Sequence, residues 1–212
     1  MSQIVWIARH ANRLDFVNPD WFLTAERRYD PPLSDDGIMQ AKQLAKRLQG
    51  EKITQIFASP FLRTVQTANE VATVHGLPIK LESGLSEWLN PAWMTAAPER
   101  HPMEELAKLF PIDTTYTNRV PANYPETAEQ ALFRSGQTAI RLADEFVHEN
   151  ILLVGHGASV HGAIMGLVPE IVKVKVSLCS LFKVVRHHPN WLLELNGDTS
   201  HLSEIEEAIR FN

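Results

Sequence analysis

The stretch Ile151-Leu152-Leu153-Val154-Gly155-His156-Gly157 decides the fold class. Its first four residues are all large and apolar. A strand with one face in water alternates apolar and polar residues, so this run predicts a strand that is buried on both faces. Such strands are typical of parallel sheets with helices packed on each side. The stretch therefore predicts an α/β protein.

The rest of the chain alternates short apolar runs with segments of helical periodicity. This order predicts a three-layer α/β sandwich, in which a mostly parallel central sheet is flanked by helices. Ser34 is predicted to cap one helix, because a hydroxyl accepts a hydrogen bond from the first helical turn. The other predicted strands are 4–8, 53–58 and 79–81, with a hairpin of 180–185 and 191–195. The predicted helices are 35–49, 60–74, 103–109, 126–147 and 157–167.

Residues 88–125 interrupt the alternation and are rich in proline. Long connections inside a compact domain are usually functional. We therefore expect residues 1–212 to form a single domain, with an insertion or lid at about 88–125.

Composition excludes several classes of function. The chain has 212 residues, with 20 Lys and Arg against 25 Asp and Glu, and a net charge of −5. Nucleic-acid binding needs a basic face, which this balance disfavours. The start MSQIVWIARH lacks the features of a signal peptide, and no 18-residue apolar stretch occurs. The single cysteine, Cys179, excludes an internal disulfide. We expect a soluble cytoplasmic protein with no nucleic-acid or membrane partner.

Four polar groups occupy corresponding places in the predicted elements. Arg9-His10 ends the first strand, and Arg63 lies in the first turn of the helix after the second strand. Glu87 follows the third strand, and His156 follows the strand at 151–154. Ligands of parallel sheets bind beyond the carboxyl ends of the strands. We therefore expect these residues to converge on one site.

This set of residues suits a phosphate group. Guanidinium groups offer paired donors to phosphate oxygens, and helix N-termini near Pro60 and Gly157 add backbone N–H groups. A histidine between arginines is expected to be neutral, because like charge disfavours its protonated form. A neutral imidazole is a nucleophile.

Competing motifs are incomplete. The chain has no G-x-x-x-x-G-K-[ST] and no H-E-x-x-H. Residues 155–160 lack the third glycine of the dinucleotide-binding motif, and residues 157–161 lack the last glycine of G-x-S-x-G.

Together, the candidate residues resemble the histidine phosphatase superfamily, also called phosphoglycerate-mutase-like. The start is most similar to the R-H-G-E-R-x-D of a subgroup that contains the ecdysteroid-phosphate phosphatases and the suppressor-of-T-cell-receptor-signalling phosphatase domains. The family's motifs R-H-G, L-S-x-x-G, S-x-x-x-R-x-x-x-T-A and G-H-G correspond to residues 9–11, 33–37, 59–68 and 155–157.

The resemblance implies a metal-independent phosphomonoesterase. His10 would be the phosphorylated nucleophile, and Glu87 the general acid and base. A small-molecule phosphomonoester or a phosphoprotein would be the substrate. No cofactor is expected, since the arginines supply the positive charge of a metal ion. The phosphate-binding residues would be Arg9, Arg13, Arg63 and His156.

Two departures from the family pattern leave alternatives open. Ala11 replaces the usual glycine, and Asn12 replaces the usual glutamate. They leave open a phospho-ligand-binding pseudoenzyme. A phosphoglycerate-type mutase is a second alternative, disfavoured because the mutase-type start R-H-G-E-S-x-x-N is not matched. A metal hydrolase that uses His10 and His156 is a third.

Aromatic and basic residues of the 88–125 segment have two interpretations. They bind the apolar body of a phosphoester, or they pack the segment on the core, which we favour. These residues are Trp93, Arg100, His101, Phe110, Tyr116 and Arg119.

Overall fold

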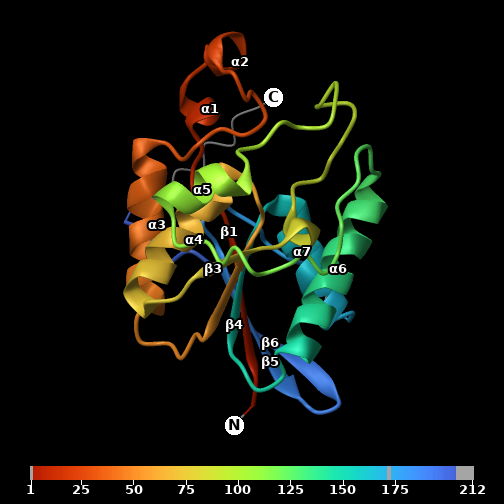
Figure 1. Ribbon diagram of the computed structural model, residues 1–212. Coiled ribbons are helices and arrows are strands. Elements are labelled where there is room, and N and C mark those ends of the chain that lie inside the picture. The colour runs from red at the N-terminus through yellow and green to blue at the C-terminus, as the bar shows by residue number, and fades with distance from the viewer. Residues whose placement is uncertain (1, 171–172, 204–212) are drawn as a thin grey trace.

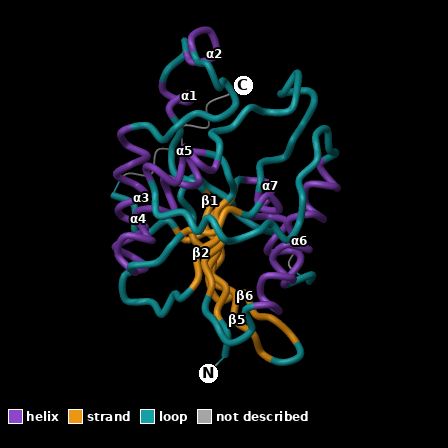
Figure 2. Tube along the Cα trace, in the orientation of Figure 1, coloured by secondary structure: helices purple, strands orange, loops and turns teal. Residues whose placement is uncertain are grey.

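A six-stranded sheet lies at the centre of the part of the chain that the computed structural model describes, residues 2–170 and 173–203 (Figures 1 and 2). Its spatial order is β3-β2-β4-β1-β5-β6, and the first four strands run parallel. β5 and β6 form an antiparallel hairpin beside β1. The prediction of a mostly parallel sheet is confirmed. The strands are β1 (Ile4–Arg9), β2 (Gln55–Ala58), β3 (Ile79–Leu81), β4 (Ile151–Gly155), β5 (Leu181–His187) and β6 (Asn190–Asp198).

β4 is the strand that the opening stretch predicts, and it lies between β2 and β1 with every residue buried. Successive side chains of a strand point to opposite faces. Leu152 and Val154 accordingly join one apolar cluster, whereas Ile151 and Leu153 join the other. The uninterrupted apolar run is thus the consequence of a core on both faces.

Helices cover both faces of the sheet (Figure 1). α3 and α4 pack on one face, and α6 and α7 on the other, so the three-layer prediction is confirmed. Two short helices, α1 and α2, lie between β1 and α3, where no helix or strand is predicted from the sequence. No helix of the described residues is long and apolar enough to span a membrane. The helices are α1 (Leu14–Val17), α2 (Trp21–Thr24), α3 (Asp35–Leu48), α4 (Leu62–His75), α5 (Met103–Leu109), α6 (Ala128–Glu145) and α7 (Gly157–Leu167).

Two helices begin later than predicted. α4 begins at Leu62 because Phe61 stays extended and buries its ring against Leu89 and Met94. α6 begins after Thr127, whose hydroxyl accepts the N–H of Gln130 in a capping box. Glu126 is therefore outside the helix.

The chain between β3 and α6 is tied to the end of the sheet by the buried carboxylate of Glu82. This carboxylate accepts hydrogen bonds from the N–H of Gly84 (2.9 Å) and the hydroxyl of Tyr116 (2.6 Å). It also accepts the N–H groups of Arg119 (2.8 Å) and Val120 (3.2 Å). These bonds fix residues 116–120 beside the 3₁₀ helix η1 (Ser83–Leu85). That 88–125 is an insertion within a single domain stays a prediction.

The crossing of α6 and α7 generates a prediction about stability. A Cβ at Gly162 would lie 2.4 Å from the carbonyl oxygen of Leu132, which is backbone and has no free rotamer. Gly162→Ala should lower the free energy of unfolding by about 1–3 kcal/mol, although alanine favours helices. Urea unfolding measures this loss. Gly50→Ala is the control, because a Cβ there meets no atom within 4 Å. Equal stability of the two variants would contradict the close crossing.

Candidate active site

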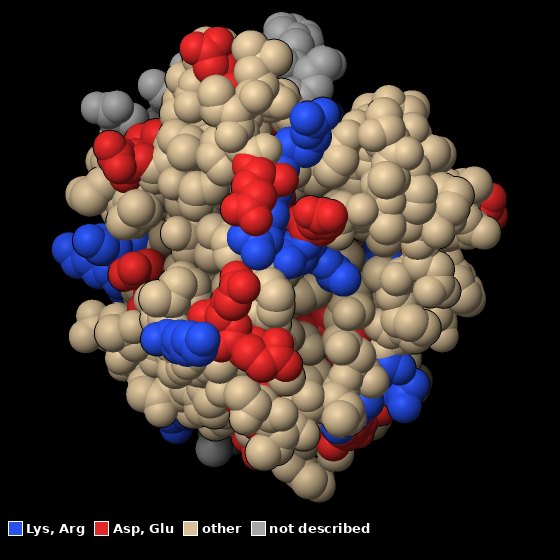
Figure 3. All heavy atoms as spheres, turned by 45° about the horizontal axis from the view of Figure 1, so that its top comes forward, with Lys and Arg blue, Asp and Glu red and all other residues tan. Residues whose placement is uncertain are grey.

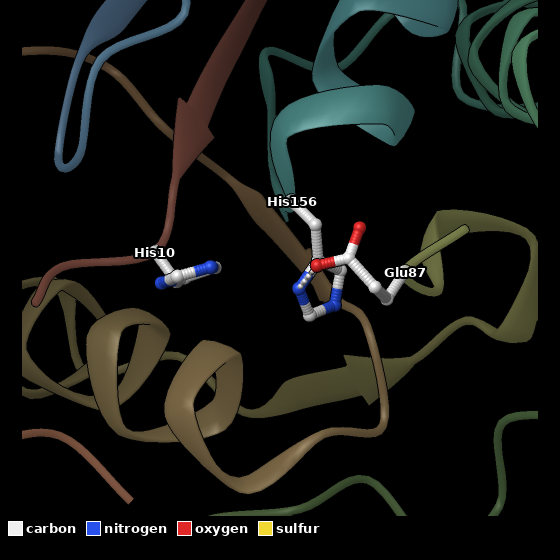
Figure 4. A group of neighbouring side chains, drawn as sticks. All are labelled: His10, Glu87 and His156. Carbon is white, nitrogen blue, oxygen red and sulfur yellow. Dashed lines mark ion pairs between the residues drawn. The ribbon is translucent and has the colours of Figure 1, made fainter. Parts of the chain in front are cut away.

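Three residues far apart in the sequence meet beyond the carboxyl ends of the parallel strands (Figure 4). His10 follows β1, His156 follows β4, and Glu87 follows η1. A nitrogen of each imidazole and a carboxylate oxygen of Glu87 all lie within 4.8 Å of one another. The two rings are fully buried and their centroids are 5.2 Å apart.

The backbone on both sides fixes the imidazole of His10. The backbone N–H of His10 donates to the carbonyl of Gly155 (2.9 Å), and the backbone carbonyl of His10 accepts the N–H of Cys179 (3.1 Å). Nδ1 lies 2.7 Å from the carbonyl oxygen of Ala11. A carbonyl only accepts, so Nδ1 carries the ring proton. Nε2 is therefore the unprotonated nitrogen, and it has no hydrogen-bond partner among the described residues.

Both histidines of the site are held neutral. Burial lowers the pKa of His10 well below its usual value, and the charge of Arg63 lowers it further. The same two causes lower the pKa of His156 well below its usual value. An unprotonated imidazole at neutral pH follows for each, as the sequence predicts for a histidine between arginines.

His156 is oriented by a serine that the sequence analysis did not single out as a site residue. Its Nε2 lies 2.8 Å from the hydroxyl oxygen of Ser59, which directly follows β2. Its Nδ1 lies 3.5 Å from Oε2 of Glu87 and makes no hydrogen bond within the described part of the chain. The Ser59 hydroxyl can donate to Nε2, and in that tautomer the ring proton is on Nδ1, facing the site.

Three arginines surround the two imidazoles. Arg63 is only 1% exposed, and burial, followed by the charge of Arg13, lowers its pKa to about 10. Its Nη2 lies 3.6 Å from Oε2 of Glu87. Burial also lowers the pKa of Arg9, which donates to the carbonyl of residue 176. Arg13 forms an ion pair with Asp15, and its charge depresses the pKa of both imidazoles.

The site holds buried nitrogens without partners. Among the described residues these are Nε of Arg9 and Arg63, Nε2 of His10 and Nδ1 of His156. Buried polar atoms are almost always hydrogen-bonded, so a group of unpaired ones indicates a place for a ligand. The two arginine nitrogens are donors, which suits an anion. Figure 3 turns the top of Figure 1 toward the viewer. It shows basic side chains gathered near the middle of the view, bordered by acidic ones.

The side chains of the two residues that depart from the family pattern are engaged elsewhere, that of Ala11 in the apolar core and that of Asn12 with α3. Ala11 is buried, donates its N–H to the hydroxyl of Thr67 and has no left-handed φ, so glycine is not required. The side chain of Asn12 turns away to α3, where its amide donates to Asp36 (2.6 Å). Neither residue alters the groups around His10.

A buried ion pair behind Glu87 also escaped the sequence analysis. Arg134 of α6 donates to the carboxylate of Glu126 and to backbone carbonyls of the loop that carries Glu87. Its spacing from Ala131 and Thr138 places it on the buried face of the helix. An arginine on an otherwise small or apolar face was the available signal.

The geometry also bears on metal binding. Two imidazoles and a carboxylate are the ligand types of zinc sites. Three guanidinium charges lie beside them, however, and repel a cation. The same charges attract an anion, so the electrostatics favour phosphate over a metal ion.

Most aromatic and basic residues of the 88–125 segment are engaged away from the site. Phe110 packs on the apolar core, and Tyr116 packs on Phe57 and donates to Glu82. Arg119 pairs with Glu145, and His101 with Asp30. Packing was the favoured interpretation. Two residues of the segment, Trp93 and Arg100, are exposed. The ring of Trp93 packs against that of Trp88, and the guanidinium of Arg100 lies over the ring of Phe61.

The buried imidazoles generate a prediction about pH. Their folded-state pKa values lie below the unfolded value near 6.5, so the unfolded chain binds more protons below that pH. The free energy of unfolding should therefore fall as the pH drops below about 6.5, by up to about 1.4 kcal/mol per pH unit for each histidine.

Urea unfolding in phosphate-free buffer measures this slope, and His10→Asn/His156→Asn is the matched variant. His201, whose pKa burial also lowers, is present in both proteins and cancels in the difference. Identical slopes in the two proteins would show that the imidazoles are not held neutral.

Comparisons with known proteins identify the family of the chain. The family model described as histidine phosphatase superfamily (branch 1) matches residues 5–199. The transcription factor tau 55 kDa subunit of Saccharomyces cerevisiae is 28% identical over 249 residues, which cover 96% of this chain. The chain spans only 57% of that protein. The probable phosphoglycerate mutase GpmB of Photorhabdus laumondii is 30% identical, over 82% of this chain and 84% of that one.

The fold is similar to solved structures as well. The crystal structure of the ecdysone phosphate phosphatase from Bombix mori, in complex with tungstate, matches with a TM-score of 0.74. The two sequences are 22% identical, and the match covers 90% of this chain and 91% of the phosphatase chain. The resemblance read from the sequence motifs is confirmed by these matches. The chain belongs to the histidine phosphatase superfamily (branch 1).

Proposed function

We propose that the protein is a phosphomonoesterase that passes the phosphoryl group of its substrate to His10 and then to water. One observation gives this proposal its main support. The Nε2 atom of His10 is unprotonated and unpaired within the described residues, and it lies among guanidinium groups. A buried nucleophile surrounded by anion-binding donors suits attack on a phosphate ester.

In the first step, Nε2 of His10 attacks phosphorus and the bond to the ester oxygen breaks. Glu87 in its protonated form gives its proton to that oxygen, which leaves as an alcohol. The imidazole gains positive charge as the N–P bond forms. The carbonyl of Ala11, 2.7 Å from Nδ1, stabilises this charge by accepting the Nδ1–H.

In the second step, water attacks the phosphohistidine in line with the N–P bond. The carboxylate of Glu87 takes a proton from the water, and the N–P bond breaks. Inorganic phosphate leaves, His10 is again neutral, and Glu87 is again protonated. Glu87 lies within 4.8 Å of both imidazoles by its nearest ligand atom, so the same carboxyl group serves both steps.

The cationic groups stabilise the equatorial oxygens of the phosphoryl group in both transition states. Arg9, Arg13 and Arg63 supply fixed charge, and Nδ1 of His156 supplies an N–H. For phosphoryl transfer this positioning and electrostatic stabilisation account for most of catalysis. Each preorganised donor typically contributes about 10²- to 10³-fold in rate. The arginines do here what a magnesium ion does elsewhere, so activity in excess EDTA is expected.

A mutase is the second candidate, because a relative that matches most of this chain is named a probable phosphoglycerate mutase. A mutase retains its product long enough to phosphorylate it again, whereas a phosphatase releases phosphate to water. An assay that compares the rate of phosphoglycerate isomerisation with the rate of phosphate release separates the two. A phospho-ligand-binding pseudoenzyme would bind phosphate without turnover. The positions of Ala11 and Asn12 give it no support, since neither perturbs His10.

The substrate is a small-molecule phosphomonoester or a phosphoprotein in this proposal. Trp93 is 56% exposed and stacks edge-on against Trp88, which adjoins Glu87. Arg100 is exposed, lies over the ring of Phe61, and Phe61 contacts the ring of His156. These two side chains are the candidates for contact with the leaving group.

The mechanism predicts the consequence of removing the nucleophile. His10→Ala should lower phosphate release from an aryl phosphate, measured in EDTA, by about 10³-fold or more. His187→Ala, at the exposed end of β5, should be unaffected. Rapid quenching of the wild type should trap an acid-labile phosphoenzyme that maps to His10. Equal activity of wild type and His10→Ala would overturn the nucleophile assignment.

A further inference from the structure

We infer that Arg134, together with Glu126, is a positioning residue that sets where the carboxyl group of Glu87 stands relative to His10. This inference rests on the proposed function, in which Glu87 is the acid and base. Arg134 touches neither the imidazoles nor Glu87's carboxylate. It acts through the backbone of the loop on which Glu87 is carried.

The guanidinium of Arg134 donates to several backbone carbonyls of that loop. Its side chain is 7% exposed. Nη1 donates to the carbonyl of Gly84 (2.7 Å), and both terminal nitrogens lie 3.3 Å from the carbonyl of Ser86. Nη2 also donates to the carbonyl of Glu87 itself (3.2 Å). One planar cation thus fixes three carbonyls of the loop, including that of the acid.

Glu126 completes the clamp from the other side. Its carboxylate receives Nε and Nη2 of Arg134, at 2.9 and 2.5 Å, in a two-pronged pair. The same carboxylate accepts the N–H of Leu89 (3.0 Å). The backbone of Glu126 pairs with the carbonyl of Leu89 and accepts the indole N–H of Trp88. The residues on both sides of Glu87 are therefore held.

The carboxyl group of Glu87 needs this support, because its contacts with His156 and Arg63 are long. Oε2 lies 3.5 Å from Nδ1 of His156 and 3.6 Å from Nη2 of Arg63, longer than good hydrogen bonds. Oε1 accepts the N–H of the adjacent Trp88 (3.0 Å). Side-chain contacts alone therefore do not set its place, and the backbone does. A misplacement of about 1 Å at a reacting group costs about 10²-fold in rate.

Stability alone does not account for a buried ion pair at this place. Desolvation of two charges typically offsets their attraction, and apolar residues of similar size often serve stability as well or better. The neighbours of Arg134 on the buried face of α6 are Ala131, Ser135 and Thr138, which are small. The pair is better explained by the carbonyls it organises.

The leaving group of the substrate provides the test. A 2,4-dinitrophenolate leaves without a proton, whereas an alkoxide needs one from Glu87. Because kcat/KM reports the phosphorylation of His10, Arg134→Gln should lower kcat/KM for an alkyl phosphate by about 10²-fold. The loss for 2,4-dinitrophenyl phosphate should be less than about threefold. A merely structural role would lower both values equally, since it reduces only the folded fraction.

Three further variants make the result decisive. Arg141→Gln is the matched control and should change neither value, because Arg141 is on the same helix but donates to the carbonyl of Arg119, away from the loop that carries Glu87. Glu126→Gln weakens the pair with Arg134 and changes the side-chain volume little. If thermal melting shows that the Arg134→Gln protein is unfolded, Glu126→Gln is tested in its place. Glu87→Gln should show the same leaving-group selectivity, and adding Arg134→Gln to it should not increase that selectivity.

The outcomes separate the two proposals. Equal losses for the two substrates, in a folded Arg134→Gln or Glu126→Gln protein, overturn the positioning role. If Glu87→Gln itself shows no selectivity, the acid assignment in the proposed function fails instead. If the selectivities of Glu87→Gln and Arg134→Gln add in the double variant, Arg134 acts independently of Glu87 and the positioning role is overturned.

Discussion

The burial of His10 and His156 among arginine side chains is the constraint on which the rest of this site depends. Burial and the charge of Arg63 together keep both imidazoles unprotonated. The carbonyl of Ala11 then fixes the proton of His10 on Nδ1 and leaves Nε2 available. Without the neighbouring cations, a buried imidazole would be inert packing. Without the burial, it would be protonated in part at physiological pH.

The sheet makes this burial possible. β1 and β4 are adjacent and parallel, with Arg9 opposite Gly155, so the residues that follow them are brought together at one edge. Both strands have a core on each face, and close packing on both sides resists a shift of either strand. The positions of His10 and His156 are therefore as well determined as the core. Glu87 lies on a loop, and its position depends on polar contacts instead.

The difference between positions set by strands and positions set by loop contacts explains which features can be predicted from the sequence. The apolar run 151–154, the cap at Ser34 and the hairpin were predictable, because each depends on local periodicity or on one side chain's bond to its own helix. Arg9, Arg63, Glu87 and His156 were identified because parallel strands share an edge. The turn of Asn12 toward α3 and the clamp of Arg134 depend on contacts between distant segments. Such contacts leave little periodic signal in a sequence.

The central claim concerns the protonation of His10, and a ¹⁵N NMR titration of the histidine side chains tests it most directly. Assigned by comparison with His10→Asn, the Nε2 resonance of His10 should keep the chemical shift of an unprotonated nitrogen, and Nδ1 that of a protonated one. Both shifts should hold as the pH is lowered past about 6.5, the ordinary value for histidine. An imidazolium spectrum for His10 at that pH would contradict the account.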